Sequence, residues 1–345
     1  MIDFLDTATR PTRQMRAAMH DAEVGDDVRR TDPTVQALER ESAARFAREA
    51  ALLVPSGTMA NLLALLLHGR PGDAVIAAAD SHVILWESGG IAAEAGLLPV
   101  AISTTDGQLS AASVSAAFRP IDDHIPPIRL VWLENSHNQS GGRVTSDRTI
   151  GEIARVCRQR EVAVHIDGAR IFNAAVALEV DVAELTEACD TLSFCLSKGL
   201  GAPVGSLLLG SAEEIREAQR LRKRLGGAMR QAGVIAAAGL VALRDGVERL
   251  AEDHARAKHL AERIRSLPGA DVVGEVQTNI VLVEVATGQA PAVSAALAES
   301  GYGVGALTSE RLRFVTHRDI TDAHVIGVVD ALARATAGAG WSLDR

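Results

Sequence analysis

Lysine and aromatic residues are scarce in this sequence, and both shortages limit what the protein can do. Of 35 basic residues, only Lys198, Lys223 and Lys258 are lysines, so chemistry that needs a side-chain amine has three candidates. Aromatic residues make up 3% of the chain, and the net charge is −9. These values exclude nucleic acid as a partner, because phosphates attract a basic surface and single strands stack on aromatic rings.

Long apolar runs are lacking as well, and cysteines are few. The longest uncharged apolar stretch, residues 232–243, has twelve residues, whereas a membrane-spanning helix needs about 20. The first ten residues carry acidic groups where a secretory signal has basic ones. The three cysteines, Cys157, Cys189 and Cys195, are an odd number and have no metal-binding spacing. We therefore expect a cytoplasmic protein with reduced thiols, no membrane partner and no bound metal.

Apolar runs of four to seven residues alternate with helical patterns through the first two thirds of the chain. This alternation is typical of a parallel sheet with crossover helices, and uninterrupted apolar runs indicate strands that are covered on both faces. The pattern predicts an α/β fold with a mostly parallel sheet and helices on both faces. The expected strands are 50–54, 74–78, 97–102, 128–133, 163–166, 191–195 and 205–209, and the clearest helices are 59–67, 149–161 and 212–225.

The alternation of short apolar runs and helical patterns ends near residue 226. One long helical stretch is expected over 231–267, followed by strands at 279–285 and 312–315 and a last helix over 323–337. These elements predict a smaller α+β domain at the C-terminal end. We divide the chain into an N-terminal arm (1–15), a large domain (16–243) and a small domain (244–345).

Lys198 differs from the other two lysines in its surroundings. It follows the apolar strand TLSFCL and Ser197, and it precedes a glycine-rich turn. Open α/β sheets place their sites at the carboxyl ends of strands, and partial desolvation there favours an amine that forms imines. Lys223 lies among arginines and Lys258 lies on an amphipathic helix, so both are expected on solvated helix faces.

A second feature has the character of a phosphate site. Ser56, Gly57 and Thr58 follow the strand ALLV and open the helix MANLLALLL. Glycine permits close approach of the backbone, and the start of a helix offers free N–H groups and a favourable dipole. Taken alone, Ser-Gly-Thr is equally consistent with an ordinary helix cap.

Asp167 ends the strand in VAVHIDGAR. A carboxylate at the tip of a buried strand is costly unless it is paired, although Asp-Gly is also a common turn. The ring nitrogen of pyridoxal phosphate would be such a partner, since a carboxylate beside it keeps it protonated and makes the ring an electron sink. Asp167 precedes Lys198 by 31 residues, about one strand–helix–strand unit, so the two residues are expected on neighbouring strands.

With these three features in this order, the chain resembles the low-specificity L-threonine aldolases. These are fold type I pyridoxal-phosphate enzymes of the β-eliminating lyase/threonine aldolase superfamily, whose fold is transferase-like. The resemblance is collinear over nearly the whole chain. The matching stretches are VGDDVRRTDPTVQALE (24–39), EAALLVPSGTMANLLAL (49–65), SHVILWESGG (81–90), LENSHNQSGGRV (133–144), HIDGARIFNAAVAL (165–178), CLSKGLGAPVGSLLLG (195–210) and LGGAMRQAGVIAAAGLVAL (225–243).

The resemblance implies a cofactor, pyridoxal 5'-phosphate, and a role for each matching residue. Lys198 is implied to hold the cofactor covalently, Asp167 to pair with its ring nitrogen, and His82 to stack on its ring. Ser197 is implied to orient the lysine or the phosphate. The implied cofactor-binding residues are Ser56, Gly57, Thr58, His82, Asp167, Arg170, Ser197, Lys198 and Arg230.

The resemblance also implies how the substrate and a second subunit are bound. Arg170 and Arg313 match arginines that hold the substrate carboxylate, and a planar guanidinium suits that task. Arg230 matches a residue that reaches the phosphate of a neighbouring subunit, so a homodimer or homotetramer with shared active sites is implied. His124 matches a histidine near the β-hydroxyl of the substrate and, with His82, is a candidate general base.

The chain departs from the family at three positions that are implied to lie near the substrate. Leu5 stands where the family has a serine that binds the carboxylate, and Arg29 stands where it has a tyrosine. Trp86 replaces a smaller aromatic residue. These substitutions leave the cofactor residues intact, so we interpret them as possible determinants of substrate specificity.

The implied activity is retro-aldol cleavage of an L-β-hydroxy-α-amino acid, similar to threonine or allo-threonine, to glycine and an aldehyde. A second interpretation keeps the cofactor and changes the bond that is broken, as in β-elimination, racemisation or glycyl transfer. A third is an inactive ligand-sensing or structural relative, against which the presence of Lys198, Asp167 and both arginines argues.

Overall fold

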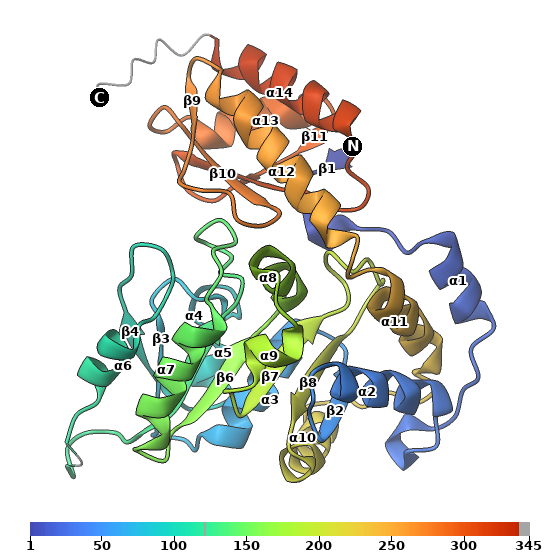
Figure 1. The fold of residues 1–345 in the computed structure, drawn as a ribbon, viewed down its shortest axis with the longest axis vertical. Coiled ribbons are helices and arrows are strands. Elements are labelled where there is room, and N and C mark those ends of the chain that lie inside the picture. Colours follow the sequence, from blue (N-terminus) through green and yellow to red (C-terminus); the bar gives the residue numbers. More distant parts are fainter. Residues whose placement is uncertain (121, 338–345) are drawn as a thin grey trace.

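A computed structural model describes residues 1–120 and 122–337. Its centre is a seven-stranded sheet that confirms all seven predicted strands (Figure 1). Only β8 runs in the direction opposite to the other six strands, so the sheet is mostly parallel, as predicted. In spatial order the strands are β2 (Ala50–Val54), β8 (Ser206–Gly210), β7 (Thr191–Cys195), β6 (Ala163–Asp167), β5 (Ile128–Glu134), β3 (Ala74–Ala78) and β4 (Leu98–Ile102).

Helices cover both faces of this sheet, because alternate residues of the strands belong to two different cores. Leu52 of β2 and Leu130 of β5 pack in one core with α3 and α10, whereas Leu53 and Val131 pack in the other with α2, α7, α8 and α11. The helices of this unit are α1 (Arg13–His20), α2 (Pro33–Arg45), α3 (Gly57–His68), α4 (His82–Leu85), α5 (Gly90–Ala93), α6 (Ala111–Ala117), α7 (Asp147–Arg158), α8 (Ile171–Leu178), α9 (Val182–Thr186), α10 (Ala212–Arg224) and α11 (Gly233–Asp245), with short 3₁₀ turns η1 (Asp6–Ala8) and η2 (Asp27–Arg29).

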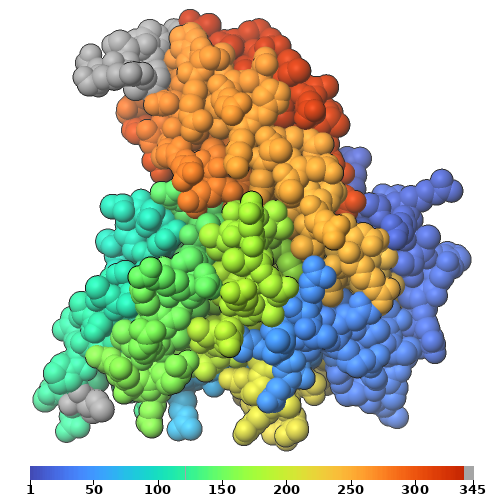
Figure 2. Space-filling view, viewed as in Figure 1, coloured from blue at the N-terminus to red at the C-terminus, as the bar shows by residue number. Residues whose placement is uncertain are grey.

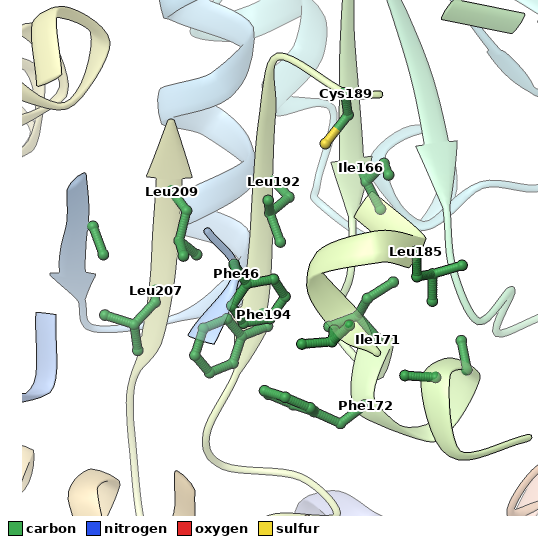
Figure 3. Close-up of a cluster of buried hydrophobic side chains, with 14 of the residues drawn as sticks. Phe46, Ile166, Ile171, Phe172, Leu185, Cys189, Leu192, Phe194, Leu207 and Leu209 are labelled. Atoms are coloured by element: carbon green, nitrogen blue, oxygen red, sulfur yellow. The ribbon is translucent and has the colours of Figure 1, made fainter. Parts of the chain in front are cut away.

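Three phenylalanines anchor the middle of the second of these cores (Figure 3). The rings of Phe46, Phe172 and Phe194 pack against one another with centroid separations of 5.2 to 5.4 Å. Phe194 belongs to β7, the strand that leads to Lys198, and Phe172 belongs to α8, which follows Arg170. The cluster therefore ties two site-bearing segments to the interior.

The predicted single helix over 231–267 is wrong. The segment forms α11 and a second helix, α12 (Leu250–Arg265), with residues 246–249 between them. A Cβ atom at Gly246 would lie 2.4 Å from the carbonyl oxygen of Ala242, so the chain turns there on a residue without a side chain. The two helices also serve different cores over most of their length: Ala236 of α11 packs with the large sheet, and Leu260 of α12 packs with the C-terminal elements, although Leu250 at the start of α12 still lies in the first core.

The C-terminal elements form a smaller α+β unit, as predicted. Its sheet has the order β12 (Gly305–Ala306), β13 (Arg311–Val315), β10 (Ile280–Val285) and β9 (Ala270–Val272), and it packs with α12, α13 (Ala290–Glu299) and α14 (Asp322–Thr336). The start of the chain joins this unit, since β1 (Ile2–Asp3) pairs with β11 (Tyr302–Gly303) and Phe4 lies in its core. Figure 2 shows this orange and red unit seated against the green segments of the first. None of the described helices is long and apolar enough to cross a membrane.

Candidate active site

A cavity of about 260 Å³ opens where the ends of β6 and β7 meet the start of α3 and strand β13 of the smaller unit. It collects residues that are far apart in the sequence. The predicted residues that line it are Ser56, Gly57, Thr58, His82, Asp167, Arg170, Ser197, Lys198 and Arg313. Asp167 ends β6 and Lys198 follows β7, and these two strands are parallel neighbours in the sheet, as the spacing of the residues predicted.

Lys198 lies in a tight turn three residues beyond β7, and the turn fixes its backbone. Its carbonyl oxygen accepts hydrogen bonds from the N–H of Gly201 at 2.8 Å and from the hydroxyl of Thr9 at 3.1 Å. Gly201 has a φ of 81°, a left-handed conformation that glycine adopts without strain. The half-buried side chain of Lys198 lines the cavity. The N-terminal arm thus helps to hold the lysine segment in place.

Helix α3 begins at the cavity wall. The side-chain oxygen of Ser56 accepts a hydrogen bond from the N–H of Met59, which caps the helix. The first N–H groups of a helix have no acceptor within the helix, so Gly57 and Thr58 offer donors to an anion. A Cβ atom at Gly57 would lie 2.9 Å from the sulfur of Cys195, so only glycine lets α3 start this close to β7.

Asp167 is buried and is held by neutral donors. Its Oδ2 accepts a hydrogen bond from Nδ2 of Asn61 at 2.8 Å, and its Oδ1 accepts one from the N–H of Ala169 at 3.1 Å. The Oδ1 of Asn61 in turn accepts a hydrogen bond from the hydroxyl of Ser193. Within residues 1–120 and 122–337, no cationic side chain forms a salt bridge with Asp167. This carboxylate is therefore ready to receive a cationic group.

The imidazole of His82 is linked to the same network through Glu87. Nδ1 of His82 lies 2.9 Å from Oε1 of Glu87, and this oxygen also accepts a hydrogen bond from Nδ2 of Asn61 at 2.7 Å. Burial lowers the pKa of His82, but the hydrogen bond with Glu87 and the charge of Asp167 outweigh it and raise the pKa. Burial raises the pKa of Glu87 as well. The pair thus holds one ring nitrogen of His82 and leaves the other available.

Arg170 and Arg313 converge at another wall of the cavity. Nε and Nη2 of Arg170 donate to the two carboxylate oxygens of Asp6 at 2.6 and 2.7 Å, a buried bidentate pair. Nη1 of Arg170 and Nη1 of Arg313 both donate to Oδ1 of Asn138, at 3.2 and 2.9 Å. Burial and the charge of Arg170 lower the pKa of Arg313 to about 10. Two cationic groups that share a neutral acceptor make a site for an anion.

Sequence reasoning missed the polar residues behind these side chains. Asp6, Asn61 and Asn138 each contact a predicted residue more than 30 positions away in the chain. Such contacts leave no local pattern. Glu87 is the exception: it lies five residues after His82 in the same segment, so the sequence indicated a polar group near the site, although not its role.

Five other predicted residues lie outside the cavity lining in this chain. The side chain of His124 is 90% exposed and pairs with Asp122, and Trp86 is 51% exposed. Arg230 pairs with Asp26 at 2.8 Å, and its side chain is 58% exposed. The remaining two are Leu5, which is half-buried in the N-terminal arm, and Arg29, whose side chain is 82% exposed. The roles assigned to these residues stay predictions.

Comparisons with known proteins agree on one family. The family described as Beta-eliminating lyase matches residues 3–287. The chain is 43% identical to the low specificity L-threonine aldolase of Escherichia coli K12 over 93% of this chain and 95% of that protein. It is 42% identical to low-specificity L-threonine aldolase 1 of Arabidopsis thaliana over 93% of this chain and 92% of that protein. The solved threonine aldolase of Leishmania major has a TM-score of 0.84 at 19% identity and covers 97% of this chain and 100% of its own.

Proposed function

Because this chain belongs to the beta-eliminating lyase family and is similar over most of its length to low-specificity L-threonine aldolases, we propose that it is a pyridoxal-phosphate-dependent aldehyde-lyase. It cleaves an L-β-hydroxy-α-amino acid of the threonine type to glycine and an aldehyde. One observation carries the proposal: a lysine, a buried carboxylate held by neutral donors, a helix N-terminus and two converging arginines line a single cavity.

The cavity fits pyridoxal phosphate by the chemistry of its donors and acceptors. The carboxylate of Asp167 is buried without a salt bridge in the described part of the chain, and a protonated ring nitrogen would supply the missing positive charge. Ser56, Gly57 and Thr58 offer donors for the phosphate, and Lys198 offers the amine for the aldehyde. When bound, the cofactor withdraws electrons from the α-carbon of the amino acid.

We assign the orientation of the substrate to the arginines. Arg313 and Nη1 of Arg170 bind the α-carboxylate, and Asp6 keeps Arg170 from turning away. A carboxylate held in this way fixes which bond at the α-carbon faces the electron-withdrawing ring. The amine of Lys198, which lines the same cavity, would move a proton at the α-carbon.

We assign the removal of the β-hydroxyl proton to His82. Its Nδ1 is held by Glu87, so Nε2 is the nitrogen that accepts the proton. His124 remains an alternative base, but in this chain its loop must approach the cavity for its ring to take part. Leu5, Arg29 and Trp86 remain the candidates for side-chain specificity.

We also propose that the enzyme is a homodimer or homotetramer whose active sites are shared between subunits. Val24 and Val234 are 42% and 41% exposed and directly follow Glu23 and Gly233, and a Cβ atom at Gly233 would lie 2.9 Å from the carbonyl oxygen of Glu23. Exposed apolar side chains in the segment that carries the exposed Arg230 suit a subunit interface at which Arg230 reaches the partner's phosphate. Mixing Lys198→Ala and Arg230→Ala subunits tests this: hybrids contain one intact site and regain activity if Arg230 acts across the interface.

Two further assignments belong to the same proposal. The chain divides into an N-terminal arm (1–15), a large cofactor-binding domain (16–243) and a small domain (244–345), in keeping with separate cores for the two sheets. The protein is cytoplasmic, in keeping with three buried cysteines that form no disulfide.

Three measurements test the proposal. Purified protein with added cofactor should absorb near the visible edge, and borohydride followed by peptide mapping should label Lys198. Lys198→Ala should lose both signals. Threonine, allo-threonine and phenylserine should yield glycine and an aldehyde. Ammonia and an α-keto acid as products, or a colourless protein with unlabelled Lys198, would contradict the proposal.

A further inference from the structure

Asn138 occupies the point at which the two substrate-binding arginines meet. Its Oδ1 accepts hydrogen bonds from Nη1 of Arg170 at 3.2 Å and from Nη1 of Arg313 at 2.9 Å. An amide oxygen has two lone pairs and can serve both donors, whereas the amide nitrogen can accept from neither guanidinium. The orientation of this side chain is therefore determined by its two neighbours.

The backbone around Asn138 is held independently of the arginines. The N–H of Asn138 donates to Oε1 of Glu134 at 2.8 Å, and the N–H of His137 donates to the carbonyl of Arg143. The same loop is tied to the smaller unit, because Thr278 donates to the carbonyl of Gly142. Asn138 thus presents its oxygen from a fixed position to Arg313 of β13 and to Arg170, which directly precedes α8.

The electrostatics of the two arginines explain why an acceptor is needed there. Arg170 has an anionic partner in Asp6, but the hydrogen bond to Asn138 joins Arg313 to a neutral group. Burial and the neighbouring charge of Arg170 both disfavour the charged form of Arg313. A neutral oxygen between the two groups accepts one hydrogen bond from each of them without cancelling the positive charge that attracts a carboxylate.

We propose that Asn138 is a positioning residue for substrate binding, with its amide oxygen standing where one oxygen of the substrate carboxylate will bind. It holds Arg170 and Arg313 in their converging arrangement before the substrate arrives. Because it is neutral, an incoming carboxylate displaces it at little cost, and the enzyme selects amines that carry an α-carboxylate. This inference rests on the proposed function, which supplies the amino-acid substrate.

The test compares Asn138→Asp, which adds a carboxylate of the same shape, with Asn138→Ala, which removes the acceptor. Gln139→Glu is the matched control, since it adds the same charge one residue away. Each holoenzyme is titrated with glycine and with methylamine, an amine without a carboxylate, while the visible spectrum is recorded. KM and kcat for threonine and the melting temperatures of holoenzyme and apoenzyme are measured in parallel.

N138D should weaken glycine binding at least about 100-fold, because its own carboxylate competes for both arginines, and N138A should weaken it several-fold. In both variants, methylamine binding should stay close to the wild type, and KM should rise more than kcat falls. Q139E should behave as the wild type does. If N138D folds poorly, N138A alone decides between the outcomes.

Two results would overturn the role of Asn138: glycine binding that is unchanged in N138D and N138A, or an equal loss of glycine and methylamine binding. The first shows that the arginines need no place-holder, and the second shows general damage to the site. A wild-type enzyme that responds to neither glycine nor threonine would instead refute the proposed function itself.

Discussion

Asp6 is the residue on which the orientation of Arg170 depends. Burial alone would raise the pKa of Asp6, but the charge and hydrogen bonds of Arg170 lower it from 3.8 to about 2. Because the folded state favours the ionised form of this carboxylate, its contribution to stability is fully present above pH 3.8, the pKa of the group in the unfolded chain. It is lost as the pH falls from there towards 2, and it amounts to about 2 kcal/mol.

We predict that Asp6→Asn destabilises the protein by about 3 kcal/mol at pH 7, because it leaves the buried guanidinium of Arg170 without its counter-charge. Unfolding in urea at pH 7 and at pH 3 measures the effect, and the difference from the wild type should shrink at the lower pH. Asp3→Asn, in the same arm, is the control. An equal difference at both pH values would show that the ion pair is not its source.

The proposed base gives a second prediction at this scale. The hydrogen bond with Glu87 helps to raise the pKa of His82, and a base with a raised pKa loses activity on acidification earlier than an ordinary histidine does. Glu87→Gln removes that charge, so the acidic limb of the kcat/KM profile should move to lower pH. Glu94→Gln, a nearby exposed acid, should leave the profile unchanged. An acidic limb that stays fixed in Glu87→Gln would rule out His82 as the base.

The residues that the sequence did and did not reveal differ in a physical way. Lys198, Asp167 and Ser56 stand at strand ends or helix starts, and the backbone itself makes such positions useful, so a local pattern finds them. Asn61 and Asn138 act through side-chain contacts across the fold. Nothing in their own neighbourhoods marks them, and only tertiary structure brings their partners together.

At the scale of elements, the bounds of helices and strands are predicted best where the element is buried on all sides. Strands β2, β3 and β7 begin and end where expected, because strands covered on both faces are uninterrupted apolar runs. The break between α11 and α12 was missed, since glycine and charged residues also occur within helices. The break lies where the chain passes from packing on the large sheet to packing on the smaller unit. The hydrophobic periodicity of the segment does not show this change.

The contact between α3 and β7 supports a prediction about these two elements. Gly57→Ala would bring a Cβ atom within 2.9 Å of the sulfur of Cys195 and push the start of α3 away from the strand. The helix then presents its N–H groups to the phosphate from the wrong position, so cofactor affinity should fall about tenfold, equivalent to ~1.4 kcal/mol. Equilibrium titration of the apoenzyme with cofactor measures this loss.

A second substitution separates crowding from other causes. Cys195→Ala removes the sulfur, so the double variant Gly57→Ala/Cys195→Ala should recover part of the affinity that the single variant loses. The coupling between the two sites is read from the double-mutant cycle. Additive effects would mean that the alanine acts through the conformation of residue 57 and not through contact with β7.

At the scale of the whole molecule, the cavity depends on two units that the chain connects at several points. Arg313 comes from the smaller unit, and Asp167 and Lys198 come from the larger one. The sequence predicted both units and their fold classes. It did not predict that β1 and Phe4 would join the smaller unit, because a two-residue strand pair with β11 has no periodic signal.

His254 of α12 joins the two units, since its Nε2 accepts a hydrogen bond from Nδ2 of Asn173 in α8 at 3.1 Å. Burial, with a contribution from the charge of Lys258, lowers the pKa of His254 from 6.5 to about 4. The folded protein therefore keeps this ring neutral, while the unfolded chain takes up a proton below pH 6.5. The contribution of His254 to stability is fully present above pH 6.5 and is lost as the pH falls towards 4, with a loss of about 1–2 kcal/mol at pH 5.

We predict that His254→Gln loses less stability than the wild type between pH 7 and pH 5. Glutamine retains an oxygen that accepts from Asn173 and has no proton to gain, so the acid-induced loss at this junction disappears. Thermal or urea unfolding at the two pH values measures the difference. His20→Gln, which removes an exposed histidine, should keep the wild-type loss. Equal losses in His254→Gln and the wild type would place the acid sensitivity elsewhere, for instance at His165, whose burial lowers its pKa further.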